Sequence, residues 1–253
     1  MTTRTVDRAG VGLGIVAATE VFRSRRGILP WLVLLSPVVV SVPMLIGAAI
    51  TGDWRTFGSL TLTLWGTLLP VLIGLMAALS VQQDNDAWLF LLASPVSRAR
   101  LVIGKFLALA GLLLAASLVL VVTLWIGALE TGTAFPLNAW AAVATMWLSS
   151  LGLLGIMLLV AIAVGLPIAV GLGALGALAG ALTGDKSIWY LVPFGWPLRS
   201  MLPFGEVHAS GTPLPSTSPL LEVGPAVGAT GLSLVVAAFA VWASCAVLKR
   251  KEI

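Results

Sequence analysis

Residues 139–183 read AWAAVATMWLSSLGLLGIMLLVAIAVGLPIAVGLGALGALAGALT, a run without a single charged side chain. As one α-helix this run would extend over about 60 Å, about twice the thickness of the hydrocarbon core of a bilayer. It therefore predicts two membrane spans rather than one. The turn between them is expected at Gly165-Leu166-Pro167, because glycine permits a sharp bend and proline restricts the residue before it.

The composition of the whole chain agrees with this stretch. Of 253 residues, 59% are hydrophobic and 9% are charged, and the mean hydropathy is +1.07. A soluble domain carries about a quarter of its residues as Asp, Glu, Lys or Arg, so a soluble enzyme is excluded. The net charge of +4 comes from basic residues in small groups between apolar runs, which is typical of membrane proteins and not of a nucleic-acid-binding surface.

Uncharged runs of about 20 residues predict six transmembrane helices and an all-α membrane protein. They run from Ile28 to Ile50, Phe57 to Val81, Phe106 to Leu129, Ala139 to Val164, Leu166 to Thr183 and Ala226 to Leu248.

The positions of lysine and arginine predict the orientation. All but three of the 14 basic residues lie before the first span, between the second and third spans, or after the last one; the exceptions are Arg55, Lys186 and Arg199. Because cytoplasmic loops carry an excess of Lys and Arg, both termini and the connection between spans two and three are expected in the cytoplasm. An even number of spans agrees with this arrangement.

Three segments outside the spans are also expected to contain helical structure. Residues 10–26 are expected to form an amphipathic helix in the cytoplasmic interface, although a leader that only supplies positive charge is an alternative. Residues 82–105 predict a short cytoplasmic helix whose apolar side needs a covering partner. Residues 184–225 are rich in aromatic residues and proline, which favours short broken helices re-entering the outer leaflet.

No catalytic arrangement is found in the sequence. His208 is the only histidine and Cys245 the only cysteine, so a zinc helix, a cysteine cluster and a histidine-based triad are all excluded. The GxGxxG match at residues 171–176 lies within an apolar span, where glycines that allow close helix packing are the favoured interpretation. Gly184-Asp185-Lys186-Ser187 lacks the glycines of a P-loop, so no cofactor site and no ATP site are expected in this chain.

Hydroxyl groups follow one face of the second span. Ser59, Thr63 and Thr67 are spaced four residues apart, which places them in one stripe along a helix. Such a stripe either lines a substrate path or hydrogen-bonds a neighbouring helix, and packing is the favoured interpretation.

This layout resembles the permease subunits of ABC-2 type ATP-binding-cassette transporters. The most specific part is Trp88-Leu89-Phe90-Leu91-Leu92-Ala93-Ser94-Pro95-Val96-Ser97-Arg98, followed by Gly104-Lys105. It is similar to the family's run of leucines, its Ser-Pro-Val-Ser-Arg stretch and the Gly-Lys pair that opens the third span. Where many members carry a glutamate early in the coupling helix, this sequence has Asp84 and Asp86.

The resemblance implies that residues 1–253 form a single ABC-2 type transmembrane domain, an exporter half that is not itself an enzyme. Two copies of a separate ABC ATPase would bind ATP and Mg²⁺, and a second permease, identical or paralogous, would complete the path in the bilayer. The implied location is the cell membrane of a bacterium. The residues implied to face the ATPase are Asp84, Asp86, Trp88, Leu89, Leu92, Pro95, Arg98, Glu20 and Arg23.

The size of the chain and its short outer loops are most similar to lantibiotic and peptide-antibiotic immunity permeases within that family. An antimicrobial peptide or another hydrophobic compound is the substrate that this similarity implies. The sequence also leaves open a membrane scaffold whose cytoplasmic segment recruits a partner that is not an ATPase. An intramembrane enzyme is disfavoured, because the Ser and Thr hydroxyls in the spans have no activating base.

Overall fold

The computed structural model describes residues 12–24, 27–85, 97–132, 137–212 and 214–250, and these residues contain helices and no β-strand. The elements are α1 (Leu13–Ser24), α2 (Leu29–Thr51), α3 (Trp54–Asn85), α5 (Arg98–Glu130), α6 (Leu137–Val164), α7 (Leu166–Thr183), the 3₁₀ turns η1 (Trp189–Leu191) and η2 (Pro193–Gly195), α8 (Trp196–Gly205), η3 (Pro219–Leu221) and α9 (Gly224–Arg250).

The six long helices α2, α3, α5, α6, α7 and α9 are each long and apolar enough to cross a bilayer, which confirms the predicted all-α membrane fold. The predicted turn between the fourth and fifth spans is also confirmed. Gly165 interrupts the helix with φ +101, a conformation that glycine adopts at low cost, and α7 begins at the next residue.

The largest difference from the predicted boundaries is in the third span. It was expected from Phe106, but α5 begins at Arg98, because the side chain of Ser97 caps the helix by accepting a hydrogen bond from the backbone N–H of Arg100. Lys105 therefore lies inside a helix that is a candidate span. A charged side chain at such a position needs partners within the protein.

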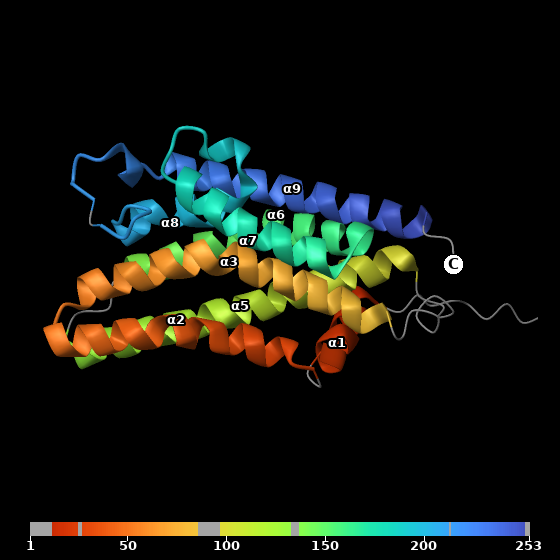
Figure 1. Cartoon of the computed structure of the whole chain (residues 1–253), viewed down its shortest axis with the longest axis horizontal. Coiled ribbons are helices and arrows are strands. Elements are labelled where there is room, and N and C mark those ends of the chain that lie inside the picture. Colours follow the sequence, from red (N-terminus) through yellow and green to blue (C-terminus); the bar gives the residue numbers. More distant parts are fainter. Residues whose placement is uncertain (1–11, 25–26, 86–96, 133–136, 213, 251–253) are drawn as a thin grey trace, which may run out of the picture.

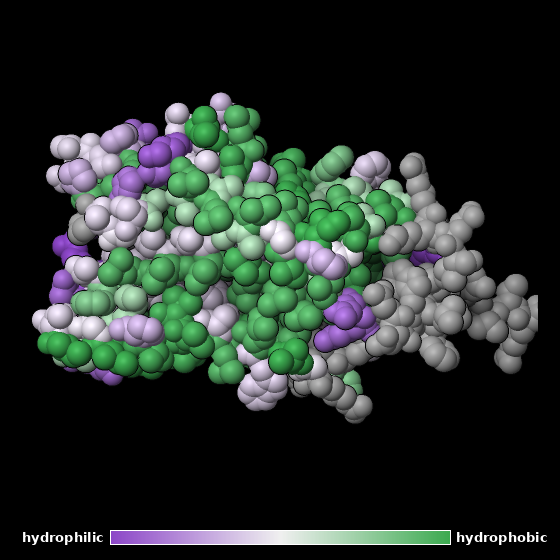
Figure 2. Space-filling model, in the orientation of Figure 1, coloured by the Kyte–Doolittle hydropathy of each residue, from purple (hydrophilic) through white to green (hydrophobic). Residues whose placement is uncertain are grey.

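The helices lie side by side in one bundle with two distinct ends (Figure 1). Helix α1, the end of α3, the start of α5 and the end of α9 gather at one end, which we term the α1 end. The start of α3 and helix α8 lie at the opposite end, which we term the α8 end. On the face seen in Figure 2, hydrophobic residues cover the middle of the bundle and more hydrophilic residues gather toward its ends, as expected for a protein surrounded by lipid.

Helix α6 packs against α9, α8, α3 and α5, while α2 packs on α3 and α5 and α7 packs on α3. Small residues allow the closest of these approaches. A Cβ added at Gly173 of α7 would lie 2.8 Å from the backbone oxygen of Pro70 in α3, and one at Gly152 of α6 would lie 2.7 Å from the backbone oxygen of Ser233 in α9. The helix-packing interpretation of the GxGxxG match is thus confirmed at Gly173, whereas Gly171 faces open space.

The segment for which a re-entrant region was predicted contains four short helical elements, η1, η2, α8 and η3. Helix α8 is the longest of them, and its first seven residues, Trp196 to Leu202, are buried. Hydroxyl groups connect it to the centre of the bundle: Ser200 Oγ lies 2.8 Å from Ser149 Oγ, and Thr145 Oγ1 donates to the carbonyl oxygen of Ser200 at 3.2 Å.

Candidate functional site

A buried lysine holds three helices together at the α1 end. Lys105 Nζ of α5 donates to Glu20 Oε2 of α1 at 3.1 Å, and to the carbonyl oxygen and Oγ of Ser80 in α3 at 3.1 and 3.0 Å. The side chains of Lys105 and Glu20 are 8% and 12% exposed. The charge is thus paired and its donors are satisfied, which is the condition for keeping an ion pair in such a place.

A second contact fixes the start of α5. Arg98 Nη1 donates to the carbonyl oxygen of Leu248, near the end of α9, at 2.9 Å. One residue further on, Cys245 Sγ of α9 lies 4.0 Å from the carbonyl oxygen of Ala99. The first turn of α5 is therefore attached to α9, and about two turns later the same helix is attached to α1 and α3.

Two of the side chains predicted to face an ATPase are therefore seen to contact this chain itself: Glu20 binds Lys105, and Arg98 binds α9. Asp84 lies in the last turn of α3 and Arg23 in the last turn of α1. The remaining residues of that predicted interface, and the side chains of these two, lie outside the described residues; the residues are Asp86, Trp88, Leu89, Leu92 and Pro95.

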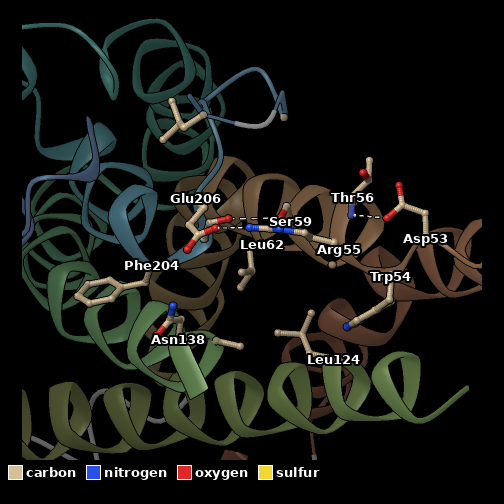
Figure 3. A pocket seen from close by; sticks show the side chains of 15 residues that line it. Asp53, Trp54, Arg55, Thr56, Ser59, Leu62, Leu124, Asn138, Phe204 and Glu206 are labelled. Carbon is tan, nitrogen blue, oxygen red and sulfur yellow. Dashed lines mark hydrogen bonds and ion pairs between the residues drawn. The ribbon is translucent and has the colours of Figure 1, made fainter. Parts of the chain in front are cut away.

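A cavity of about 730 Å³ lies at the α8 end (Figure 3). It lies between the start of α3, the end of α5, the start of α6 and the chain from Phe204 to Leu214. Its lining residues are Asp53, Trp54, Arg55, Thr56, Gly58, Ser59, Leu62, Leu124, Asn138, Ala139, Phe204, Gly205, Glu206, Gly211 and Leu214.

Charged groups from the start of α3 and from the residue after α8 meet in this cavity. Arg55 Nη2 donates to Glu206 Oε2 at 2.6 Å, and the two side chains are 84% and 46% exposed. Asp53 caps α3 by accepting a hydrogen bond from the backbone N–H of Thr56 at 3.1 Å. Hydrogen bonds from the side chain and then from the backbone of Thr56 lower the pKa of Asp53, so this carboxylate stays ionised at neutral pH.

The predicted hydroxyl stripe has three different environments. Ser59 lines the cavity and donates to the carbonyl oxygen of Gly205 at 3.3 Å. Thr63 is buried and donates to the carbonyl oxygen of Ser59 within its own helix, and Thr67 is half-buried. Of the three, Ser59 is the one that a molecule in the cavity would contact.

A further charged cluster lies beside the cavity end of the bundle, around the connection from α7 to α8. The side chain of Asp185 is almost completely buried; its Oδ2 accepts a hydrogen bond from Lys186 Nζ at 3.2 Å and lies 2.9 Å from His208 Nε2. Arg199 of α8 is 7% exposed, and its Cζ lies 6.0 Å from the centre of the Trp189 ring. Burial lowers the pKa of Arg199, while the charges of Asp185 and Glu222 oppose that shift.

Sequence reasoning did not single out several of these residues. Arg55 and Glu206 are far apart in the chain, and no local pattern connects them. Lys105 was noted within a Gly-Lys pair and among the basic residues that set the orientation, but not as a residue that pairs within the bundle. A lysine at the boundary of an apolar run is a signal in itself, because ionisable side chains near the membrane are rare and need partners. Among the described residues no three His, Cys, Asp or Glu side chains gather as metal ligands would.

A family model described as "ABC-2 family transporter protein" matches residues 17–175, from α1 into α7. No curated protein and no solved structure matches the chain. The matched range contains Glu20, Ser80 and Lys105, and also the whole predicted coupling segment 82–105.

Proposed function

The chain belongs to the ABC-2 family of transporter proteins, and on that premise we propose that it is the transmembrane permease of an ATP-driven exporter that works with a separate ABC ATPase. ATP and Mg²⁺ bind to the ATPase, and this chain supplies the path through the bilayer. The observation that carries the proposal is the family match over residues 17–175, which includes the segment expected to contact the ATPase.

The contacts at the α1 end support a transmission role for that end of the bundle. Residues 86–96 connect α3 to α5, and both helices are attached to others close to this connection: Lys105 of α5 binds Glu20 of α1 and Ser80 of α3, and Arg98 binds α9. A force applied to the connection therefore reaches α1, α3, α5 and α9 together. With this attachment, movement of the ATPase would shift the spans together as a rigid unit and would not merely bend the connecting loop.

The finer parts of the proposal rest on the sequence. Two ATPase copies and a second permease complete the transporter, the α1 end faces the cytoplasm with both termini, and the segment 184–225 re-enters the outer half of the membrane. The location is the cell membrane of a bacterium. The exported compound is an antimicrobial peptide or another hydrophobic molecule, and export protects the cell that carries the transporter.

The test is isolation of the full-length protein from its native membrane in a mild detergent, with mass spectrometry and an ATP-hydrolysis assay on the same eluate. A P-loop ATPase in a fixed ratio to the permease is expected. Trp88→Ala is expected to lower that ratio at least fivefold, because a large apolar anchor commonly dominates an interface.

Trp140→Ala is the matched control, since Trp140 directly follows Asn138 and Ala139, which line the cavity at the α8 end, away from the predicted contact. The ATPase should remain bound to this variant. If no ATPase is isolated with the protein under conditions that preserve other membrane complexes, the result favours a membrane scaffold over a transporter. Equal ATPase binding by both tryptophan variants would mean that residues 82–105 do not form the ATPase interface.

A further inference from the structure

We propose that the cavity at the α8 end binds an amphipathic organic cation, a molecule with an apolar body and one positively charged group. The proposal rests on the charges around the cavity, on the backbone that holds one of them, and on the apolar surface below them. It deepens the proposed function, because it assigns a substrate class to the end of the bundle where an exported molecule leaves.

The charge of the cavity favours a cation. Two carboxylates, Asp53 and Glu206, and one guanidinium, Arg55, are the charged groups among its lining residues. Arg55 and Glu206 neutralise one another at 2.6 Å, and the carboxylate of Asp53 remains. The charged lining therefore has an excess of one negative charge, which attracts a positively charged group and repels an anion.

Glu206 has an unusual backbone for its residue type. It is the residue after α8, and with φ +50 and ψ +34 it has the left-handed conformation that most often belongs to glycine at this position. Among the described residues other than glycine it alone has a positive φ. A strained residue that presents a charged side chain to a cavity is typical of a functional site, since glycine would end the helix at lower cost.

The apolar part of the cavity is suited to the body of such a molecule. Leu62 and Leu124 are buried beneath the charged groups, and Trp54 and Phe204 line other parts of the wall (Figure 3). The faces of aromatic rings attract cations, and the same rings also provide apolar surface. A volume of about 730 Å³ is within the range of pockets for small organic molecules, and is far larger than a metal ion requires.

The probes for the test are tetraphenylphosphonium and tetraphenylborate, two ions of nearly the same shape and opposite charge. The full-length protein is placed in phosphatidylcholine nanodiscs without ATPase or ATP, and binding is measured by equilibrium dialysis against empty nanodiscs. Saturable binding of tetraphenylphosphonium is expected, with at least tenfold preference over tetraphenylborate, because the apolar surface is shared and only the charge differs.

Four variants assign the binding to this cavity. Glu206→Gln and Asp53→Asn are each expected to weaken tetraphenylphosphonium binding about tenfold by removing one negative charge. Asparagine is as good a helix cap as aspartate, so Asp53→Asn keeps the start of α3. Arg55→Gln is expected to strengthen binding several-fold, because it removes a like charge and frees Glu206. Glu222→Gln, at an exposed carboxylate outside the cavity, is the control and should bind as the unmodified protein does.

Glu206→Gly separates loss of charge from loss of fold. Glycine suits the left-handed backbone at this position, so the variant should fold at least as well as Glu206→Gln and still bind tetraphenylphosphonium about tenfold more weakly. The proposal is overturned if binding does not exceed that of empty nanodiscs, if tetraphenylborate binds equally well, or if the carboxylate variants bind like the control. Each result concerns this chain alone, so ATPase association can succeed or fail independently of it.

Discussion

Lys105 and Glu20 are 85 residues apart in the sequence, yet Lys105 Nζ lies 3.1 Å from Glu20 Oε2 and both side chains are almost completely buried. Helix α1 carries its carboxylate into the bundle, and the same ammonium group also binds Ser80. The ion pair therefore attaches the N-terminal helix to α5, against which it also packs, and the same lysine links α5 to α3.

Removing either partner of this ion pair should loosen α1. Lys105→Met leaves Glu20 as a buried charge without its counter-ion, and Glu20→Gln leaves Lys105 in the same state; breaking a buried pair in this way costs about 3–5 kcal/mol. The double variant should be more stable than the sum of the two single effects predicts. Thermal unfolding in detergent measures the stability, and chymotrypsin cleavage after the exposed Phe22 measures the release of α1.

Arg55→Gln is the matched control for this cycle, because it breaks a different long-range ion pair, whose arginine is 84% exposed. Exposed pairs contribute about 0–1 kcal/mol, so its unfolding temperature should change little and α1 should stay protected. Strictly additive effects of Lys105→Met and Glu20→Gln would mean that the two side chains do not interact in the folded protein.

The close approach of α3 and α7 predicts a strong effect of one added methyl group. Gly173→Ala would place a Cβ 2.8 Å from a backbone oxygen of α3, so the two helices must separate. Overpacking of this kind costs about 1–3 kcal/mol. Gly171→Ala, two residues away in the same helix, faces open space and should be neutral or slightly stabilising. Unfolding temperatures of the two purified variants decide the prediction, and equal values would contradict the packing of α7 on α3.

The start of α3 should weaken in acid. Hydrogen bonds with Thr56 hold the pKa of Asp53 below its ordinary value of 3.8. A lowered pKa in the folded protein means that the cap stabilises the helix above that ordinary value and that the stabilisation is lost as the pH falls through the folded pKa. Asp53→Ala lacks the cap at every pH.

The difference in unfolding temperature between the unmodified protein and Asp53→Ala should therefore be constant from about pH 7 to about pH 5 and should shrink below about pH 4. Asp53→Asn keeps a cap that does not titrate, and it is the reference for other effects of acid. A difference that persists unchanged at the lowest pH would show that the carboxylate does not carry the stabilisation.

The spans could be predicted from the sequence because their signal is local. A bilayer of fixed thickness demands an apolar run of a certain length, and each predicted run corresponds to a helix whose limits differ by a few residues at most positions. The turn at Gly165 was predictable for the same reason, since glycine and proline act on their immediate neighbours. The predicted start of α5 was too late, because Ser97 caps the helix at Arg98, before the apolar run begins at Phe106.

The charged contacts could not be predicted in this way. Arg55 and Glu206, or Lys105 and Glu20, meet only after the helices have packed, and an almost uniformly apolar helix gives little indication of which face is buried. The exposed residues of α2, such as Trp31, Leu35 and Val39, are as apolar as the buried Val33. In lipid, hydrophobicity does not distinguish buried from lipid-facing positions. Which charged side chains pair therefore depends on how the helices are arranged in the bundle.

Asp185 and Arg199 should prove to be coupled through charge. Arg199 is buried, and neither its Nε nor its Nη1 has a hydrogen-bond partner within the described part of the chain; burial lowers its pKa and the charge of Asp185 opposes that shift. Asp185→Asn keeps an oxygen that can accept from His208 but removes the negative charge. The variant should lose about 2 kcal/mol of stability, because the buried guanidinium of Arg199 loses the negative charge that most offsets its burial.

Arg199→Met removes the buried charge and its unpaired donors while keeping most of the side-chain volume, so it should cost less than about 1 kcal/mol. The double variant Asp185→Asn/Arg199→Met should then be more stable than Asp185→Asn alone, since the cation that needed the carboxylate is gone. Glu222→Gln is the control: its carboxylate also acts on Arg199 but is exposed, so its removal should change the stability by less than about 0.5 kcal/mol. If Arg199→Met fails to rescue Asp185→Asn, Asp185 stabilises the α8 end through His208 and Lys186, and not through the buried arginine.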